Sequence, residues 1–126
     1  MATSVTLTGN LTRDPDTRTT SSTSFTRFGL AVNRRWRTTS GEWETKVSFF
    51  DVVAFGALGE HAQATLSKGD SVIISGRVEQ STWENAEGER RSRVEVIADD
   101  LGPSLRWATA VVSRVPSADS AGLLAA

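Results

Sequence analysis

The chain has 126 residues, of which 38% are hydrophobic and 23% charged, a composition that suits one globular domain and excludes a multidomain enzyme. It has no cysteine and no apolar stretch long enough to span a membrane, so we expect no disulfide, no thiolate metal site, no membrane contact and a cytoplasmic location. The net charge of −1 hides an asymmetry, because residues 1–40 hold six Arg and only two Asp.

Alternating apolar residues predict two strands in the first forty residues. Val5 and Leu7 alternate with threonines in a first strand. Residues 13–24 are polar, contain a proline and many Thr and Ser, and predict a loop. From Phe25 to about Arg37 the alternation returns and predicts a second strand. One face of that strand carries Phe28, Leu30 and Val32, and the other carries Arg27, Gly29, Ala31 and Asn33.

A third strand and a short helix follow. Turn residues at 38–41 predict a hairpin into residues 44–55, a strand that is apolar on both faces near its end. Gly56 ends this strand. Residues 57–67 then change to a four-residue apolar period, with Lys68 and Gly69 as a stop signal, which predicts one helix.

The rest of the chain predicts a second hairpin and a tail. Residues 72–78 and 94–98 alternate as two strands, and residues 85–88 form the turn between the two arms. A further edge strand is predicted over residues 107–115. Residues 116–126 are small, Ser/Ala-rich and without period, so we expect a flexible tail after a domain of residues 1–115.

The predicted element order is β-β-β-α-β-β. This order indicates an all-β OB-fold, a five-stranded Greek-key barrel with one short helix between strands three and four, plus a possible C-terminal edge strand. A ferredoxin-like fold would need a helix between the first two strands, where residues 13–24 oppose one. An SH3-like barrel stays possible but would leave the helix at residues 57–67 unexplained.

The sequence offers little for catalysis. His61 is the only histidine, and on a helix without metal-ligand spacing it is expected to face solvent. Asp99 and Asp100 are adjacent, would point to opposite faces of a strand, and are interpreted as a strand-end turn rather than a Mg²⁺ site. Nucleotide-binding glycine patterns are absent from the sequence. We therefore predict no catalytic residue, no metal, no cofactor and no enzymatic activity.

Aromatic residues beside arginines are the main functional signal. Unpaired nucleotides bind through rings that stack on bases and cations that pair with phosphates. Trp36, Trp43 and Trp83 lie on the two predicted hairpins. Each could either cap its hairpin or stack on a base, and stacking is favoured for Trp36 and Trp83. Phe49 and Phe55 share their strand face with Val47 and Val53, so alternation makes core burial at least as plausible as stacking. The neighbouring arginines are Arg34, Arg35 and Arg37 around Trp36, and Arg90, Arg91 and Arg93 after Trp83.

Several ordered motifs resemble those of the bacterial single-stranded DNA-binding protein family. They are the stretches 5–15, 28–32, 50–56, 66–72 and 74–78 together with Trp36 and Trp83, and residues 101–109 are similar to the actinobacterial branch of that family. The resemblance implies an OB-fold subunit, usually a homotetramer, that wraps single-stranded DNA without sequence preference. It also implies that Trp36, Phe49, Phe55 and Trp83 are the stacking rings.

The chain departs from the family pattern at several positions. Residues 80–82 are Gln-Ser-Thr where many members have bases, and Ala57 and Asp51 also stand where a base is common. Phe50 replaces a histidine that is frequent at the subunit contact. The chain ends in a tail with Asp119 as its only charge, so recruitment of other proteins through an acidic tail tip is not expected.

Our sequence-based hypothesis is a non-enzymatic coat for single-stranded DNA in replication, recombination or repair. The rings would stack bases, and the predicted phosphate contacts are Arg34, Arg35, Arg37, Lys68, Arg77, Arg90, Arg91 and Arg93. The first alternative is an OB-type protein-interaction module, such as a primosome-like accessory factor, motivated by the net acidity and the missing bases before Trp83. A nucleic-acid enzyme is the second alternative, and it lacks a recognisable set of catalytic residues.

Overall fold

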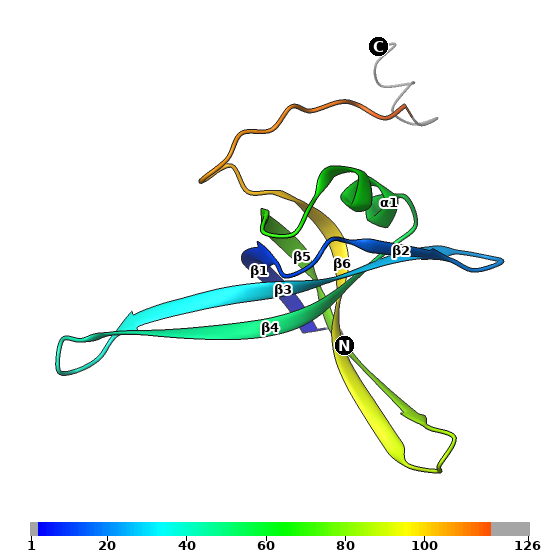
Figure 1. The fold of residues 1–126 in the computed structure, drawn as a ribbon, viewed down its shortest axis with the longest axis horizontal. Coiled ribbons are helices and arrows are strands. Elements are labelled where there is room, and N and C mark those ends of the chain that lie inside the picture. Colours follow the sequence, from blue (N-terminus) through cyan, green and yellow to red (C-terminus); the bar gives the residue numbers. More distant parts are fainter. Residues whose placement is uncertain (1–2, 117–126) are drawn as a thin grey trace.

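The structure is a computed structural model that describes residues 3–116. It is a mostly β molecule with a single helix in the described part of the chain (Figure 1). The elements are β1 (Thr3–Leu11), β2 (Asp16–Thr19), β3 (Ser24–Arg37), β4 (Trp43–Phe55), α1 (Gly56–Thr65), β5 (Ser71–Glu84) and β6 (Arg90–Pro103).

Five of the strands close into a barrel. Their hydrogen-bonded order is β1-β5-β6-β4-β3, and β3 returns to pair with β1. All these pairings are antiparallel except β4 with β6, which run parallel and pair at two positions, Val52 with Val96 and Val53 with Ile97. Because α1 lies between β4 and β5, the predicted OB-fold with a helix between the third and fourth barrel strands is confirmed.

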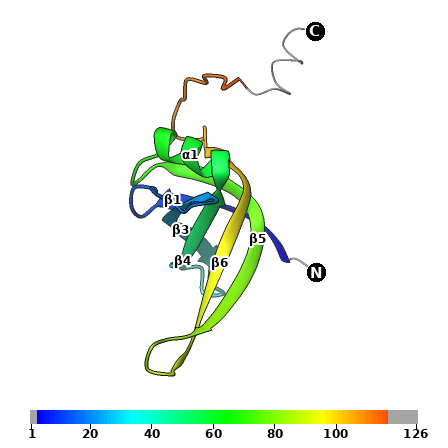
Figure 2. The ribbon, with the colours of Figure 1, turned by 90° about the vertical axis from the view of Figure 1, so that its right-hand side faces the viewer.

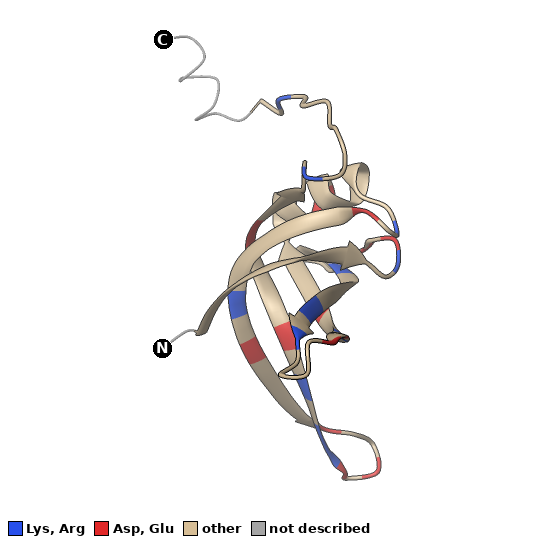
Figure 3. Cartoon of the chain, turned by 90° about the vertical axis from the view of Figure 1, so that its left-hand side faces the viewer, with Lys and Arg blue, Asp and Glu red and all other residues tan. Residues whose placement is uncertain are grey.

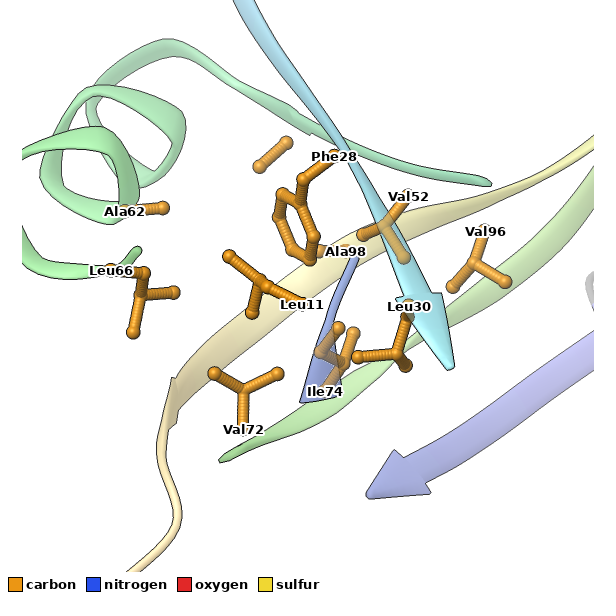
Figure 4. Close-up of a cluster of buried hydrophobic side chains, with 11 residues drawn as sticks. Leu11, Phe28, Leu30, Val52, Ala62, Leu66, Val72, Ile74, Val96 and Ala98 are labelled. Atoms are coloured by element: carbon orange, nitrogen blue, oxygen red, sulfur yellow. The ribbon is translucent and has the colours of Figure 1, made fainter. Parts of the chain in front are cut away.

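The core fills the space between the barrel strands and α1. Phe28, Leu30, Val52 and Ile74 are completely buried there, and Ala62 and Leu66 close the end of the barrel from the helix side (Figure 4). Burying each large apolar side chain contributes about 1.5–3 kcal/mol. The face that alternation assigned to Phe28 and Leu30 is therefore the core face.

Gly59 lets α1 approach the barrel closely. A side chain at this position would meet the carbonyl oxygen of Ala54 and the hydroxyl of Thr26. Thr26 is itself fully buried, and its hydroxyl is hydrogen-bonded to that of Thr17 at 2.7 Å. The helix can cover the barrel end at this point only because Gly59 leaves room for the strand.

Two long two-stranded ribbons project from the barrel and diverge from each other (Figures 1 and 2). The β3–β4 ribbon keeps one unbroken register from the pair Phe25–Phe55 to the pair Arg37–Trp43. In the β5–β6 ribbon, residues beyond Val78 pair only with β6, ending at the pair Glu84–Arg90. The turns use glycines with positive φ, Gly41 at 86° and Gly88 at 78°, as the turn-forming sequences predicted.

The prediction of an unbroken loop over residues 13–24 is wrong. Residues 16–19 form β2, which pairs with residues 24–27 of β3. This strand carries no apolar alternation, because it lies at the sheet edge with both faces largely exposed. It is held by its ladder and by the Thr17–Thr26 hydroxyl pair, which satisfies a buried polar group.

Two further predictions near the C-terminal end are wrong. Residues 107–115 form no strand and run over the α1 end of the barrel without a pairing partner in the described residues. Asp99 and Asp100 lie inside β6 rather than in a turn, because a β-bulge opposite Ser75 and Gly76 lets the strand continue to Pro103. Of the predicted tail, residues 117–126 lie outside the described part of the chain.

Candidate nucleic-acid interface

Strand alternation assigns each ribbon side chain to one of two faces. In both ribbons the even-numbered residues near the barrel, such as Phe28, Val52 and Val96, point into the core. Odd-numbered residues therefore point away from it. The parallel pair Val53–Ile97 joins the odd-numbered surfaces of the two ribbons into one continuous surface, which we call the outer face.

Five aromatic rings lie on the outer face. Phe49 and Phe55 are 73% and 50% exposed, so the alternative that they are core residues is wrong. Trp83 is 44% exposed on the β5–β6 ribbon, and Trp43 lies at the start of β4 with the same parity as the two phenylalanines. Phe25 on β3 flanks Phe55 with 6.5 Å between ring centroids. The rings thus extend along both ribbons.

Trp36 lies on the other face of the β3–β4 ribbon. It pairs with Glu44 and shares the even parity of Phe28 and Leu30, but it lies beyond the barrel, so the indole is exposed rather than in the core. The guanidinium of Arg34 lies 5.7 Å from its ring centroid. The four predicted stacking rings are therefore all at the surface but do not share one face.

A buried carboxylate lies where the two ribbons meet on the outer face. Glu95 is only 8% exposed, and its Oε2 lies 3.5 Å from Nη2 of Arg27 on β3 and 3.8 Å from Nη1 of Arg93. Val53 and Ile97 form the floor beside it, buried yet outside the core cluster. The two arginine side chains remain nearly half exposed, although the Nε of Arg27 is buried.

Sequence reasoning missed two cations of this surface. Alternation placed Arg27 on the strand face opposite that of Phe28, but no role was predicted for it, although its parity matches that of Phe25 and Phe55. Arg13, from the segment after β1, reaches the outer face with Nη2 at 4.0 Å from Oδ1 of Asp51. The odd position of Arg27 in its strand was enough to predict its place on this surface. The position of Arg13 could not be predicted, because it depends on the path of the loop after β1.

Arginines on the β5–β6 ribbon are paired with carboxylates. Arg77 lies 3.2 Å from Asp99 and 3.5 Å from Glu79, and Arg91 lies 3.3 Å from Glu89. Basic and acidic segments follow one another along this ribbon (Figure 3). Arg90 pairs in register with Glu84 and lies on the even face. The positive charge of this ribbon is therefore largely neutralised locally.

The β3–β4 ribbon differs, because its arginines lie against rings. Arg35 lies 4.5 Å and Arg37 5.7 Å from the ring centroid of Trp43. Within residues 3–116, no carboxylate lies within ion-pair distance of Arg34, Arg35 or Arg37. Lys68 belongs to neither ribbon. It lies in the turn after α1, where its backbone N–H donates to Asp14.

The described residues form no recognisable catalytic centre. No group of three or more His, Asp or Glu residues among them is placed to hold a metal ion. His61 is exposed on α1, as predicted, and lines a small cavity with Leu58 and Leu101. No helix within residues 3–116 has the length and apolar character needed to cross a membrane. The features that stand out remain the rings and arginines of the two ribbons.

The match to a protein-family model shows to which family the chain belongs. The model of the single-strand binding protein family matches residues 2–104, which include the whole barrel and both ribbons. The chain belongs to the single-strand binding protein family. The resemblance based on the ordered sequence motifs is therefore confirmed. The predicted similarity to the actinobacterial branch is confirmed by relatives from Mycobacterium and Corynebacterium.

Two similar proteins are described as single-stranded DNA-binding proteins. A single-stranded DNA-binding protein of Mycobacterium leprae is 40% identical over 115 residues, covering 89% of this chain and 68% of the relative. One of Corynebacterium glutamicum is 38% identical over 117 residues, covering 90% of this chain and 52% of the relative. The family and these relatives are described by binding and not by a reaction.

Solved structures agree with the family assignment. The small single-stranded DNA-binding protein of Streptomyces coelicolor superposes with a TM-score of 0.69 at 28% identity, over 83% of this chain and 96% of that one. A deletion mutant of the single-stranded DNA-binding protein of Thermus aquaticus gives a TM-score of 0.74 at 29% identity, over 85% and 52% of the two chains. The barrel with its helix is thus the fold of this family.

Proposed function

We propose that the chain binds single-stranded DNA without sequence preference and protects it during replication, recombination or repair. Bases stack on Phe49, Phe55 and Trp83 along the outer face, and on Trp36 on the other face of the β3–β4 ribbon. Every base has a flat face, so stacking tolerates any sequence and contributes about 1–3 kcal/mol per base. The observation that supports the proposal most directly is the row of exposed rings on two ribbons of a single-strand binding family member.

Phosphate pairing supplies the second part of the mechanism. The arginines that lie against rings, Arg34, Arg35 and Arg37, meet phosphates as their bases stack beside them. Arg27 and Arg93 meet the DNA strand where it crosses between the ribbons, and their side chains are nearly half exposed. The paired Arg77 and Arg91 contribute less, because a phosphate must compete there with carboxylates. Lys68 lies outside this path, and Arg90 lies on the even face.

Titration with oligo-dT tests the proposal. Three of the four tryptophans lie on the ribbons, so their emission is expected to change as DNA is added, and labelled oligo-dT is expected to be retained at low salt. Duplex DNA of equal length is the control. It should bind more weakly, because its bases are already stacked. Unchanged emission together with no retained DNA at low salt rejects the proposal. Capture of a protein but no nucleic acid would instead favour the interaction-module alternative.

We further propose that the protein assembles as a homotetramer, the state that the family resemblance implied. A subunit with two diverging ribbons presents rings in several directions, and Trp36 lies on a different face from Phe49. Several subunits together could present these faces to one continuous strand. Mass measurement in solution, with and without oligo-dT, tests this assembly; a monomer in both conditions would contradict it.

A further inference from the structure

We infer that Trp43 is a fifth base-stacking ring, which extends the DNA path along the outer face to the tip of the β3–β4 ribbon. This inference rests on the proposed function and adds a site to it. Neither the family match nor the resemblance assigns a role to this residue. The alternative is that Trp43 only caps its hairpin by packing on neighbouring side chains.

The strand register places Trp43 in line with two proposed stacking rings. Phe55, Phe49 and Trp43 follow one another on β4 at intervals of six residues, and the β3–β4 pairing has no bulge between them. An even interval on an unbroken strand keeps all three side chains on the outer face. At about 3.3 Å per residue the rings are about 20 Å apart. Trp36, by contrast, points to the opposite face.

Trp43 is also more open than a hairpin cap requires. It is 57% exposed, more than Phe55 or Trp83. The guanidinium of Arg35 lies 4.5 Å from its ring centroid, close enough for a cation–π contact, and the guanidinium of Arg37 lies 5.7 Å away. Arg37 is additionally fixed by donating from Nε to the carbonyl oxygen of Gly41 at 3.1 Å. A ring and two cations are therefore held together before any ligand arrives.

The local charge suits a polyanion. Residues 34–46 contain four bases and two acids, whereas residues 77–95 on the other ribbon contain four bases and five acids. The tip of the β3–β4 ribbon combines a flat ring with cations that have no carboxylate partner in the described residues. These are the two requirements for one nucleotide, a stacked base and a paired phosphate. Preorganisation lowers the ordering cost of binding.

Substitutions at position 43 separate stacking from packing. Trp43→Leu keeps apolar bulk but has no π face, and it should weaken oligo-dT binding about five- to hundredfold. Trp43→Phe restores a ring and should recover most of the affinity. Trp107→Leu is the matched control, since it also removes an exposed tryptophan but lies outside both ribbons. Equal affinities of the Trp43→Leu variant and the wild type, in a protein that binds oligo-dT, would overturn the inference.

A single-tryptophan protein gives an independent readout. Replacing Trp36, Trp83 and Trp107 by Phe leaves Trp43 as the only tryptophan. Its emission should be quenched as oligo-dT is added, while anisotropy of a labelled oligonucleotide reports binding separately. Binding without any change in Trp43 emission would overturn the inference and leave the proposed function intact. If the wild-type protein shows no binding, the proposed function itself fails.

Discussion

Arg27 on β3 and Glu95 on β6 form an ion pair across the junction of the two ribbons, with 3.5 Å between Nη2 and Oε2. Glu95 is also shared with Arg93 at 3.8 Å. Two cations of the proposed DNA surface are therefore partly neutralised by a carboxylate that is almost completely buried. Neither the Nε of Arg27 nor the Oε2 of Glu95 has a hydrogen-bond partner within residues 3–116. The Arg27–Glu95 ion pair should therefore influence both the unfolding free energy of the barrel and the affinity for DNA.

Glu95→Gln should therefore lower stability and raise DNA affinity. The loss of the ion pairs should cost about 1 kcal/mol of unfolding free energy, a modest value because both arginine side chains are nearly half exposed and their charges are screened by water. Removing a negative charge from the binding surface should strengthen oligo-dT binding by about 0.5–1 kcal/mol at low salt. Urea unfolding and anisotropy titration measure the two effects.

Glu60→Gln on α1 is the matched control for this variant. It removes the same charge at an exposed helix position away from the ribbons, so both quantities should stay near the wild-type values. Weaker DNA binding by the Glu95→Gln variant would show that the carboxylate mainly holds the two arginines in place.

Phe49→Ala should weaken DNA binding without unfolding the barrel. The ring is 73% exposed, so its removal should change the unfolding free energy by less than about 0.5 kcal/mol. The loss of one stacked base should weaken oligo-dT binding by about 1–3 kcal/mol. Phe28→Ala, which removes a fully buried ring, should instead cost about 3–5 kcal/mol of stability. A lower melting temperature for Phe49→Ala than for Phe28→Ala would contradict the assignment of Phe49 to the surface and of Phe28 to the core.

The salt dependence of binding should distinguish ring-packed from acid-paired arginines. On a single strand the logarithm of the binding constant falls with the logarithm of salt by about 0.7 per neutralised phosphate. Arg34→Ala should therefore make this slope shallower by about 0.7. Arg77→Ala should change it less, because Asp99 and Glu79 already pair with that guanidinium. Titrations at several salt concentrations give both slopes, and equal changes would contradict this distinction.

Gly76→Ala should destabilise the barrel at the bulge in β5–β6. A β-carbon at this position would meet the backbone carbonyl of Ile97, which cannot move without disturbing the ladder. Crowding of this kind costs about 1–3 kcal/mol. Gly102→Ala is the control, because a β-carbon there has open space around it. Equal melting temperatures for the two variants would contradict the close packing at Gly76.

Much of the barrel could be predicted from period-two alternation, because the faces that carry Phe28 and Leu30 are buried. β2 could not, since an edge strand exposed on both faces has no apolar pattern. Residues 107–115 carry valines suited to a strand but have no partner strand in the described part of the chain. Alternation of apolar and polar residues describes only one strand at a time. It therefore cannot predict which strands pair with each other.

The candidate site, too, could be predicted from the sequence only in part. Ring and arginine types were visible in the sequence, and parity alone put Phe49 and Phe55 on one face. Whether that face was core or surface depended on its place in the barrel, since the neighbouring Val53 is buried and Phe55 is half exposed. Glu95 was missed because its partner Arg27 is 68 positions away in the chain. Ion pairing between distant strands requires the three-dimensional register.

Ultraviolet cross-linking to oligo-dT tests the central claim that DNA follows the exposed rings of the two ribbons. After digestion, mass spectrometry would locate the thymine adducts on individual residues. We predict adducts at Phe49, Phe55 and Trp83, with none on α1. Adducts confined to α1 or to residues 105–116, with the ribbon rings unmodified, would contradict the account.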